Sequence, residues 1–105
     1  MPEEALDPLL HQPVRLQIAA YLYRNRQAGF TELRDALGLT AGNLQSHGDK
    51  LRQAGYIEIQ RVLVGIFEVR WRITEKGEQA FVSYYAQLRG LMERLDPALR
   101  DEGKP

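Results

Sequence analysis

The stretch TELRDALGLTAGNLQSHGDKLRQAG begins at residue 31 and predicts two short helices joined by a tight turn. Thr31 suits the N-cap of the first helix, whose leucines fall on one face. Gly38 suits its end because glycine tolerates positive φ, and Thr40 can cap the second helix. Two helices around a short glycine-containing turn form a helix-turn-helix, whose second helix enters the major groove of DNA. Many helical hairpins share this pattern, so the rest of the chain has to show whether this one is a helix-turn-helix.

Composition places the chain among ordinary globular proteins. Its 105 residues suffice for one domain, and they are 44% hydrophobic and 27% charged. We see no run of about 18 apolar residues and no basic-then-apolar leader, so we expect neither a membrane span nor a signal peptide. The absence of cysteine excludes disulfides and thiolate metal sites. These features together favour a cytoplasmic protein.

The charge is zero overall but unevenly spread. Residues 1–10 carry three acids and no base, and residues 11–76 carry ten Lys or Arg against six Asp or Glu. Residues 77–105 carry four basic residues against five acidic ones. The basic surplus therefore falls on the helix-turn-helix and the segments next to it. A surplus of this size permits DNA binding without arguing strongly for it.

The sequence YIEIQRVLVGIFEVRWRI, residues 56–73, predicts a β-hairpin around Gly65 because β-branched and aromatic residues dominate it. A two-residue loop would mix arginines with isoleucines on one face, whereas the loop 64–66 separates an apolar face from a salt-bridged one. The pairs in this register are Leu63–Phe67, Ile59–Trp71 and Ile57–Ile73 on the apolar face, and Glu58–Arg72 and Gln60–Arg70 on the other. Arg61 falls on the apolar side, near the tip.

A hairpin that follows a helix-turn-helix is the wing of a winged helix, and a very short third strand is expected at Gly29-Phe30. The fold class is therefore α+β, mostly helical: a winged helix-turn-helix with a C-terminal dimerisation helix. We expect a single domain over residues 1–105, built from an N-terminal dimerisation segment (6–12), the helix-turn-helix (31–54), the wing (56–73), a C-terminal helix (75–95) and a tail (96–105). Asp7 and Pro8 suit a short helical turn, and Pro13 suits the start of a core helix that ends near Asn25. The last residues, 101–105, are expected to be disordered.

The C-terminal helix carries an apolar stripe that a body of this size cannot cover. Thr74 is a good N-cap, and Asp96-Pro97 ends the helix after about 20 residues, or roughly 30 Å. The stripe consists of Phe81, Tyr84, Tyr85, Leu88, Leu91, Met92 and Leu95, spaced alternately by three and four residues. Packing within the monomer is one interpretation. We favour a homodimer interface that also includes Leu6, Leu9 and Leu10.

At this point the chain resembles the MarR- and ArsR-like winged-helix transcriptional regulators. Four motifs carry the resemblance in order: D-P-L-L-H-x-P-x-R-L at Asp7 to Leu16; T-x-G-N-L-S-x-H-L in Thr40, Gly42, Asn43, Leu44 and His47; A-G-Y-[VI] at Ala54-Gly55-Tyr56-Ile57; and L-T-x-x-G at Ile73-Thr74-Glu75-Lys76-Gly77. The resemblance covers about residues 6–95. It implies a winged-helix fold, DNA binding and a homodimer.

Three departures from the family pattern change the expectations. Gln45 stands where serine is usual, and Gly48 stands at a core position that usually holds leucine. Glycine inside a helix costs about 1 kcal/mol relative to alanine, and the missing leucine leaves space that another group or a close backbone has to fill. The wing tip Gly65-Ile66-Phe67-Glu68 replaces a basic tip. Because it has no cation to neutralise a phosphate, we expect it to contribute less affinity for DNA than usual.

The predicted DNA contacts lie on the outward side of the second helix. Asn and Gln can each make a bidentate contact to adenine, Ser can contact a base or a phosphate, and Lys and Arg suit phosphates. The candidate residues are Thr40, Ala41, Gly42, Asn43, Gln45, Ser46, His47 and Lys50 on this helix, Arg34 on the helix before it, and Arg61 and Arg70 on the wing. The alternative for each polar residue is a solvated helix face. For His47 it is a structural histidine.

Enzyme chemistry finds no support in the sequence: the glycines do not fit a phosphate-binding loop, and no catalytic triad or carboxylate pair is indicated. We expect no metal and no cofactor. Two hypotheses remain: a homodimeric, sequence-specific DNA-binding transcriptional regulator, with double-stranded DNA as partner, and a winged-helix protein–protein interaction module with weak or no DNA binding. In the second, the apolar tip Val64, Ile66 and Phe67 would dock a protein. An effector could occupy a cleft beside the C-terminal helix, although no residue points to one.

Overall fold

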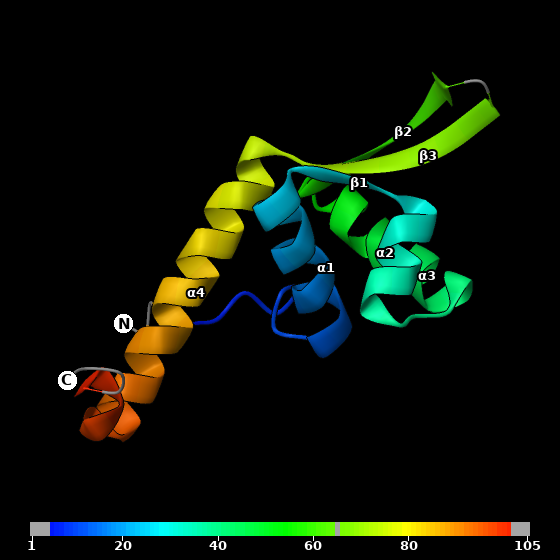
Figure 1. Ribbon diagram of the computed structural model, residues 1–105. Coiled ribbons are helices and arrows are strands. Elements are labelled where there is room, and N and C mark those ends of the chain that lie inside the picture. Colours follow the sequence, from blue (N-terminus) through cyan, green and yellow to red (C-terminus); the bar gives the residue numbers. More distant parts are fainter. Residues whose placement is uncertain (1–4, 65, 102–105) are drawn as a thin grey trace.

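The computed structural model of the protein describes residues 5–64 and 66–101 (Figure 1). Its elements are α1 (Pro13–Asn25), β1 (Gln27–Gly29), α2 (Phe30–Leu37), α3 (Ala41–Gln53), β2 (Ile57–Val64), β3 (Ile66–Ile73), α4 (Glu75–Leu95) and the 3-10 helix η1 (Pro97–Asp101). The strands form an antiparallel sheet in the order β1-β3-β2. This is the mostly helical α+β winged helix that the sequence predicted.

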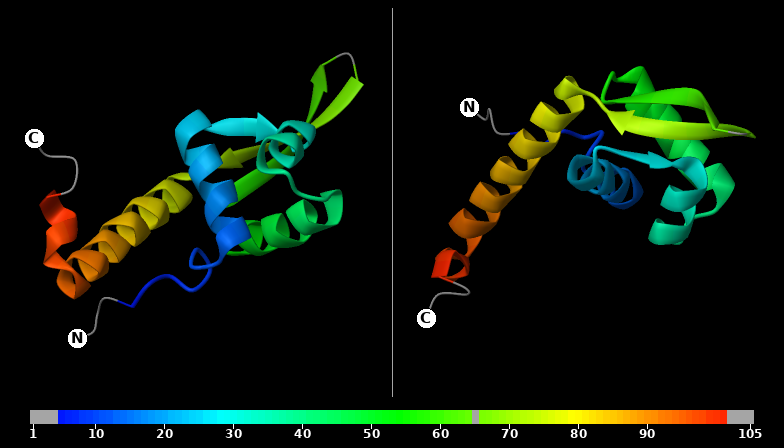
Figure 2. Two further views of the ribbon diagram at one scale, coloured as in Figure 1. Left: turned by 60° about the horizontal axis from the view of Figure 1, so that its bottom comes forward. Right: turned by 45° about the horizontal axis from the view of Figure 1, so that its top comes forward.

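The sheet lies across α1, α2 and α3, and α4 leaves this body at the end of β3 (Figures 1 and 2). Because α4 projects outward, the molecule measures 52 × 34 × 23 Å along its principal axes. The outer end of the hairpin also extends past the helices. The body thus presents two projections, one formed by α4 and one by the wing (Figure 2).

Side-chain caps fix the starts of α3 and α4 where the sequence placed them. The Thr40 hydroxyl accepts from the backbone N–H of Asn43 at 3.0 Å, and the Thr74 hydroxyl accepts from that of Gly77 at 3.0 Å. Each bond satisfies one of the N–H groups that a helix start leaves without an intrahelical partner. Helix α1 likewise starts at Pro13 and ends at Asn25, as predicted.

The predicted start of α2 and the predicted short strand were both slightly wrong. Gly29, not Thr31, is the N-cap of α2, and Phe30 begins the helix instead of ending a strand. The cause is the Glu32 carboxylate, which accepts from the backbone N–H of Gly29 at 3.3 Å and fixes the helix start there. The strand β1 accordingly runs from Gln27 to Gly29 and pairs with β3.

The hairpin has the predicted register, with Ile57 opposite Ile73, Ile59 opposite Trp71 and Glu58 opposite Arg72. The pairing extends one step into the predicted loop, to residues 64 and 66. The apolar face is covered only near the base of the hairpin: Ile57 is 3% exposed, whereas Leu63 is 70% exposed. The helices end before the hairpin does, so its outer half has no layer beneath it.

Trp71 fills the space that Gly48 leaves in the core. A Cβ built at residue 48 would overlap the six-membered part of the indole, and Trp71 itself is fully buried. The Phe30 ring meets the indole edge-on with ring centroids 5.8 Å apart. A side chain from β3 therefore occupies the space where the family resemblance implied a leucine on α3.

The N-terminal end of the chain agrees with expectation, and the C-terminal end differs in part. Asp7 does cap a turn, since its carboxylate accepts from the Leu9 N–H at 2.8 Å. At the other end, residues 97–101 form η1 instead of a tail, because Asp96 accepts from the backbone N–H of Ala98 at 3.2 Å through its side chain and from that of Leu99 at 3.0 Å through its carbonyl. The remainder of the predicted tail, residues 102–105, lies outside the described residues.

Candidate nucleic-acid interface

Helix α3 has a packed inner face and an open outer one. Leu44, Gly48 and Leu51 are buried against the body. The predicted contact residues on the outside of this helix are all exposed: Ala41, Gly42, Asn43, Gln45, Ser46 and Lys50. Thr40, also exposed, already uses its hydroxyl to cap the helix. The sequence therefore oriented this helix correctly.

Asp49 belongs to the same outer face, although we did not include it among the predicted contacts. Its Oδ1 accepts from the Gln45 amide Nε2 at 2.9 Å and lies 3.9 Å from Arg52 Nε. Residues four apart in a helix lie above one another, so the spacing of Gln45 and Asp49 was the signal that could have found this pair. The Asp49 carboxylate therefore holds the amide of Gln45, one of the residues predicted to contact a base.

His47 lies at the border between the two faces and bonds to the preceding elements. Its Nδ1 lies 3.2 Å from a guanidinium nitrogen of Arg15, whose Nε donates to the Leu9 carbonyl at 2.6 Å. Because arginine only donates, Nδ1 accepts and the ring proton sits on Nε2. Partial burial lowers the pKa of His47, and the charges of Arg15 and Lys50 lower it further. His47 is thus a neutral side chain that connects α3 to α1.

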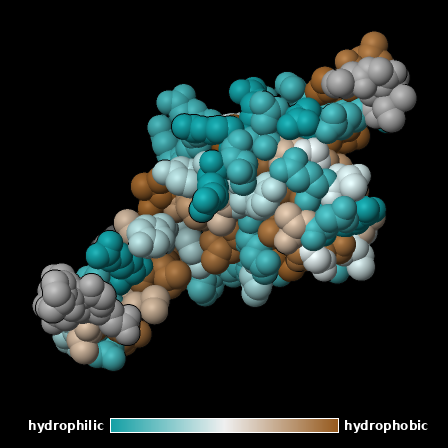
Figure 3. Space-filling model, viewed as in Figure 1, coloured by the Kyte–Doolittle hydropathy of each residue, from teal (hydrophilic) through white to brown (hydrophobic). Residues whose placement is uncertain are grey.

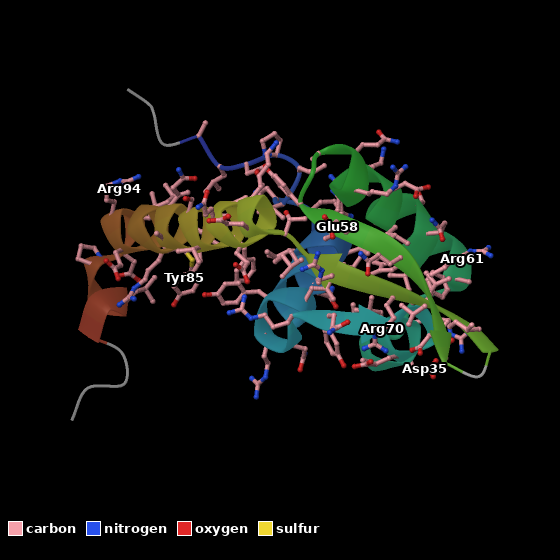
Figure 4. All side chains as sticks on the ribbon, turned by 90° about the horizontal axis from the view of Figure 1, so that it is seen from above. Asp35, Glu58, Arg61, Arg70, Tyr85 and Arg94 are labelled. Carbon is pink, nitrogen blue, oxygen red and sulfur yellow. The ribbon has the colours of Figure 1, made fainter. Side chains whose placement is uncertain are left out.

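The two wing arginines predicted to contact DNA lie on opposite faces of the sheet. Arg61 shares the face of β2 that carries the buried Ile57, so it lies on the α3 side, whereas Arg70 lies on the outer face. Seen from above, Arg61 projects on the α3 side of the hairpin and Arg70 lies over the β1 side (Figure 4). Arg70 donates to Glu68 at 2.9 Å and to Gln27 at 3.1 Å. Of the two, only Arg61 lies on the side of the recognition helix.

The charge around the outer face of α3 is mildly positive. Lys50 and Arg52 are exposed on α3, and Arg34 on α2 is half-exposed with its Nε 3.1 Å from Asp35. Asp49 is the acid on this face, while Glu68 lies on the far face of the sheet with Arg70. These three cations, set against Asp35 and Asp49, give this side a small positive surplus. The tip side chains of Val64, Ile66 and Phe67 are not among the side chains that the structure describes.

The predicted dimer surface divides into a covered part and an open part. Leu10 and Tyr84 are 1% and 3% exposed within the single chain, so they offer no surface to a partner. Tyr85, Met92 and Leu95 are 58%, 46% and 77% exposed. Leu6, Leu9, Phe81, Leu88 and Leu91 lie between these extremes. Figure 3 shows hydrophobic residues along α4 and where it meets the body.

The N-terminal segment is tied to its own chain by polar contacts. The Tyr56 hydroxyl donates to the Asp7 carboxylate, and His11 Nδ1 lies 2.7 Å from the Tyr84 hydroxyl. Burial, followed by the bond to Asp7, raises the pKa of Tyr56 to about 12. These contacts join the segment to the turn after α3 and to α4. We attribute the burial of Leu10 to them.

A small apolar groove runs between α1 and α4. Its lining residues are Leu16, Ala20, Phe81, Tyr84, Tyr85 and Leu88.

Within residues 5–64 and 66–101, no three His, Cys, Asp or Glu side chains cluster as metal ligands would. No helix in this part of the chain combines the length and apolar character that crossing a membrane requires.

Comparison with known proteins assigns the family. A profile of winged helix DNA-binding domains matches residues 14–92. The chain belongs to this family. It is 33% identical over 89 residues to an uncharacterized protein of Methanocaldococcus jannaschii, an alignment covering 84% of this chain and 97% of that one.

Solved structures agree with this assignment. The structure of a transcriptional regulator homologue from Pyrococcus horikoshii superposes with a TM-score of 0.82 at 31% identity, covering 84% of this chain and 88% of that one. The transcriptional repressor BigR from Xylella fastidiosa gives a TM-score of 0.61 at 26% identity, with 74% of each chain covered. The predicted membership of the winged-helix DNA-binding proteins is confirmed. By its family, this chain is a winged helix DNA-binding domain.

Proposed function

We propose that this protein is a homodimeric, sequence-specific transcriptional regulator that places α3 in the major groove of DNA. The observation that carries the proposal is the division of α3 into a packed inner face and an exposed outer face rich in amide and hydroxyl groups. A dimer with one such helix in each subunit would read a pseudo-palindrome, one half-site per subunit. Binding to chromosomal DNA agrees with a cytoplasmic location.

Within this proposal the contacts fall into two groups. Asn43 and Gln45 read bases, because an amide side chain matches the adenine edge, and Ser46 contacts a base or a phosphate. Phosphates are bound by cations on the same side of the molecule. These cations are Lys50, Arg52, Arg34 and Arg61. Phosphate contacts set the register of the protein on DNA, and the amides supply the preference for sequence.

The proposed dimer interface uses the apolar residues of α4 that remain exposed, above all Tyr85, Met92 and Leu95. Leu6 and Leu9 lie partly exposed at the N-terminal segment and extend this surface. The described residues cover these side chains only in part, and burying their remaining apolar surface against a second copy removes about 25 cal/mol of unfavourable free energy per Å². Sedimentation velocity should therefore give a dimer. Met92→Lys with Leu95→Lys should yield monomers, whereas Ser83→Lys, on the opposite side of α4, should not.

The test of function is binding to mixed-sequence duplex DNA as salt is raised, with the oligomeric state followed in parallel. A dimer contacting several phosphates should lose affinity steeply, with a slope in log K against log salt of about −0.9 per phosphate. Lys50→Ala should flatten that slope by about 1 for each contact removed, and Arg70→Ala, on the outer sheet face, should not. A dimer that binds no duplex even at low salt would contradict the proposal.

A second candidate, a protein-interaction module, is favoured by one observation. Leu63 is 70% exposed on the outer half of the wing, where no helix covers it. An apolar side chain in that position suits contact with a protein better than contact with a phosphate. Loss of partner binding in Leu63→Lys, in a protein that binds no DNA, would support this second function.

A further inference from the structure

The outer face of α3 carries an acid where a DNA-reading surface is otherwise cationic. Asp49 accepts from the Gln45 amide at 2.9 Å and lies 3.9 Å from Arg52. A carboxylate close to phosphates lowers affinity for every DNA sequence, because like charges repel. Its position beside Gln45 gives it a different use, which is to fix the orientation of that amide.

We propose that Asp49 is a positioning residue for Gln45 and that the pair selects adenine and rejects guanine at one position of each half-site. The proposal rests on the DNA-binding function proposed above and names the base that this part of the interface reads. Gln45 makes the contact with the base. Asp49 acts through Gln45 and through its own negative charge.

The orientation follows from what each group can donate and accept. An ionised carboxylate only accepts, so Asp49 bonds to the nitrogen end of the Gln45 amide and one Nε2 hydrogen is used. The amide keeps its Oε1 acceptor and its second Nε2 hydrogen. Without Asp49, the amide could turn over and exchange its oxygen and nitrogen. The carboxylate therefore favours one of two orientations.

The remaining groups match the edge of adenine. In the major groove adenine offers the N6 amino group as donor and N7 as acceptor, which pair with Oε1 and the free Nε2 hydrogen. Guanine also offers N7 as an acceptor for the free Nε2 hydrogen, but its O6 acceptor would face Oε1 with no hydrogen between them, and the bond to Asp49 keeps the amide from turning over. Cytosine offers a single amino donor and matches in part. Adenine is accordingly preferred and guanine is the base most strongly excluded.

The pair has a simpler role that the experiment has to separate from this one. A Gln–Asp pair four residues apart steadies a helix by about 0.2–0.5 kcal/mol whether or not DNA is bound. A purely structural pair would change stability slightly and leave base preference unaltered. Base preference is therefore the decisive measurement.

The experiment uses the full chain and duplexes enriched by the wild type from a randomised pool. Competition binding then compares all four base pairs at each half-site position for the wild type, Gln45→Ala, Asp49→Ala and Asp49→Asn. Gln45→Ala should abolish a preference on the order of tenfold at one position, which identifies the base that Gln45 reads. Asp35→Ala, which removes an exposed acid from α2, is the matched control for charge.

Asp49→Ala should lower the ratio of adenine to guanine affinity at that position by about twofold or more. It should also raise affinity for mixed-sequence DNA by about twofold at low salt, because a negative charge is lost. Asp49→Asn can either accept from or donate to the Gln45 amide, so it no longer favours one orientation: it should raise overall affinity and lower the adenine preference, as Asp49→Ala does. Asp35→Ala should leave the preference unchanged.

Three results would overturn the proposal, and they differ in what else they affect. If Asp49→Ala keeps the wild-type preference at the position identified by Gln45→Ala, Asp49 does not position Gln45, and the DNA-binding function stands. If the wild type binds no duplex at low salt, both the function and this inference fail. A preference for guanine at that position would also refute the inference.

Discussion

The two faces of α3 place opposite demands on neighbouring residues. Position 48 accepts only glycine, because the Trp71 ring occupies the space beside it. The next residue, Asp49, is half-exposed. Its hydrogen bond to Gln45 and its ion pair with Arg52 both stay within α3. One face of the helix is thus fixed by packing and the other is available for binding.

This difference teaches that stability and recognition are separable on one short helix. A change on the inner face should alter the free energy of unfolding and leave sequence preference intact in the folded molecules. A change on the outer face should do the reverse, since exposed substitutions rarely move stability by more than about 0.5 kcal/mol. Each prediction below tests this separation.

The largest effect is expected for Gly48→Ala. The new methyl group would overlap the buried indole of Trp71, and overpacking of this kind costs about 1–3 kcal/mol, only partly offset by the better helix propensity of alanine. Chemical denaturation should show a loss of about 2 kcal/mol in the free energy of unfolding. Asp49→Ala is the neighbouring control.

A double-mutant cycle sharpens this test. Trp71→Leu should cost less in the Gly48→Ala background than in the wild type, because the smaller side chain makes room for the added methyl group. Additive costs would mean that the two residues do not share the space as described.

The next effect in size is a loss of DNA affinity in Asn43→Ala. Asn43 is exposed on the outer face, and losing a bidentate base contact costs about 1–3 kcal/mol of discrimination. The melting temperature should remain within a few degrees of the wild type. A large drop in stability would mean that Asn43 contributes to packing, which would contradict the separation of the two faces of α3.

The sequence predicted much of this division because local patterns determine it. Thr40 and Thr74 cap their helices as expected, and the hairpin register followed from the requirement that apolar residues share a face. The outer residues of α3 followed from the positions of Leu44 and Leu51. Caps, periodicity and strand alternation act over a few residues, so they can be read from the chain.

Contacts between distant residues could not be predicted in the same way. The sequence indicated that something fills the space beside Gly48, but Trp71 lies 23 positions further along and its packing depends on the whole fold. The burial of Leu10 and Tyr84 likewise depends on how the N-terminal segment and α4 meet the body. Asp49 is different, since its spacing from Gln45 was visible in the sequence.

A smaller effect is expected for Thr40→Ala at the start of α3. The hydroxyl of Thr40 accepts from the Asn43 backbone N–H, and loss of such a cap costs about 1 kcal/mol. The first turn also carries the outer contacts, so this variant should lower both thermal stability and DNA affinity. Thr40→Ser, which keeps the hydroxyl, should restore both. If only thermal stability or only DNA affinity fell, the first turn of α3 would serve packing alone or DNA binding alone.

The smallest effect concerns His47, which lies between the faces. Its pKa is lowered from 6.5 by burial and by Arg15 and Lys50, so the folded protein disfavours the charged imidazole. Below pH 6.5 the unfolded chain binds more protons, and stability should fall with pH until the folded-state pKa is passed. Unfolding curves measured from pH 7.5 to pH 5 should show a shallower decline in the free energy of unfolding for His47→Gln than for the wild type. An equal decline in both proteins would remove His47 from this role.

The most direct test of the central claim is amide NMR during titration with duplex DNA. If the outer face of α3 is the interface, the largest shifts should fall on residues 41–50, with Gln45, Ser46 and Lys50 prominent, and the indole N–H of Trp71 should move little. Outer-sheet residues Arg70 and Arg72 should also move little. Largest shifts on the outer sheet face or on α4, with α3 unaffected, would contradict the account.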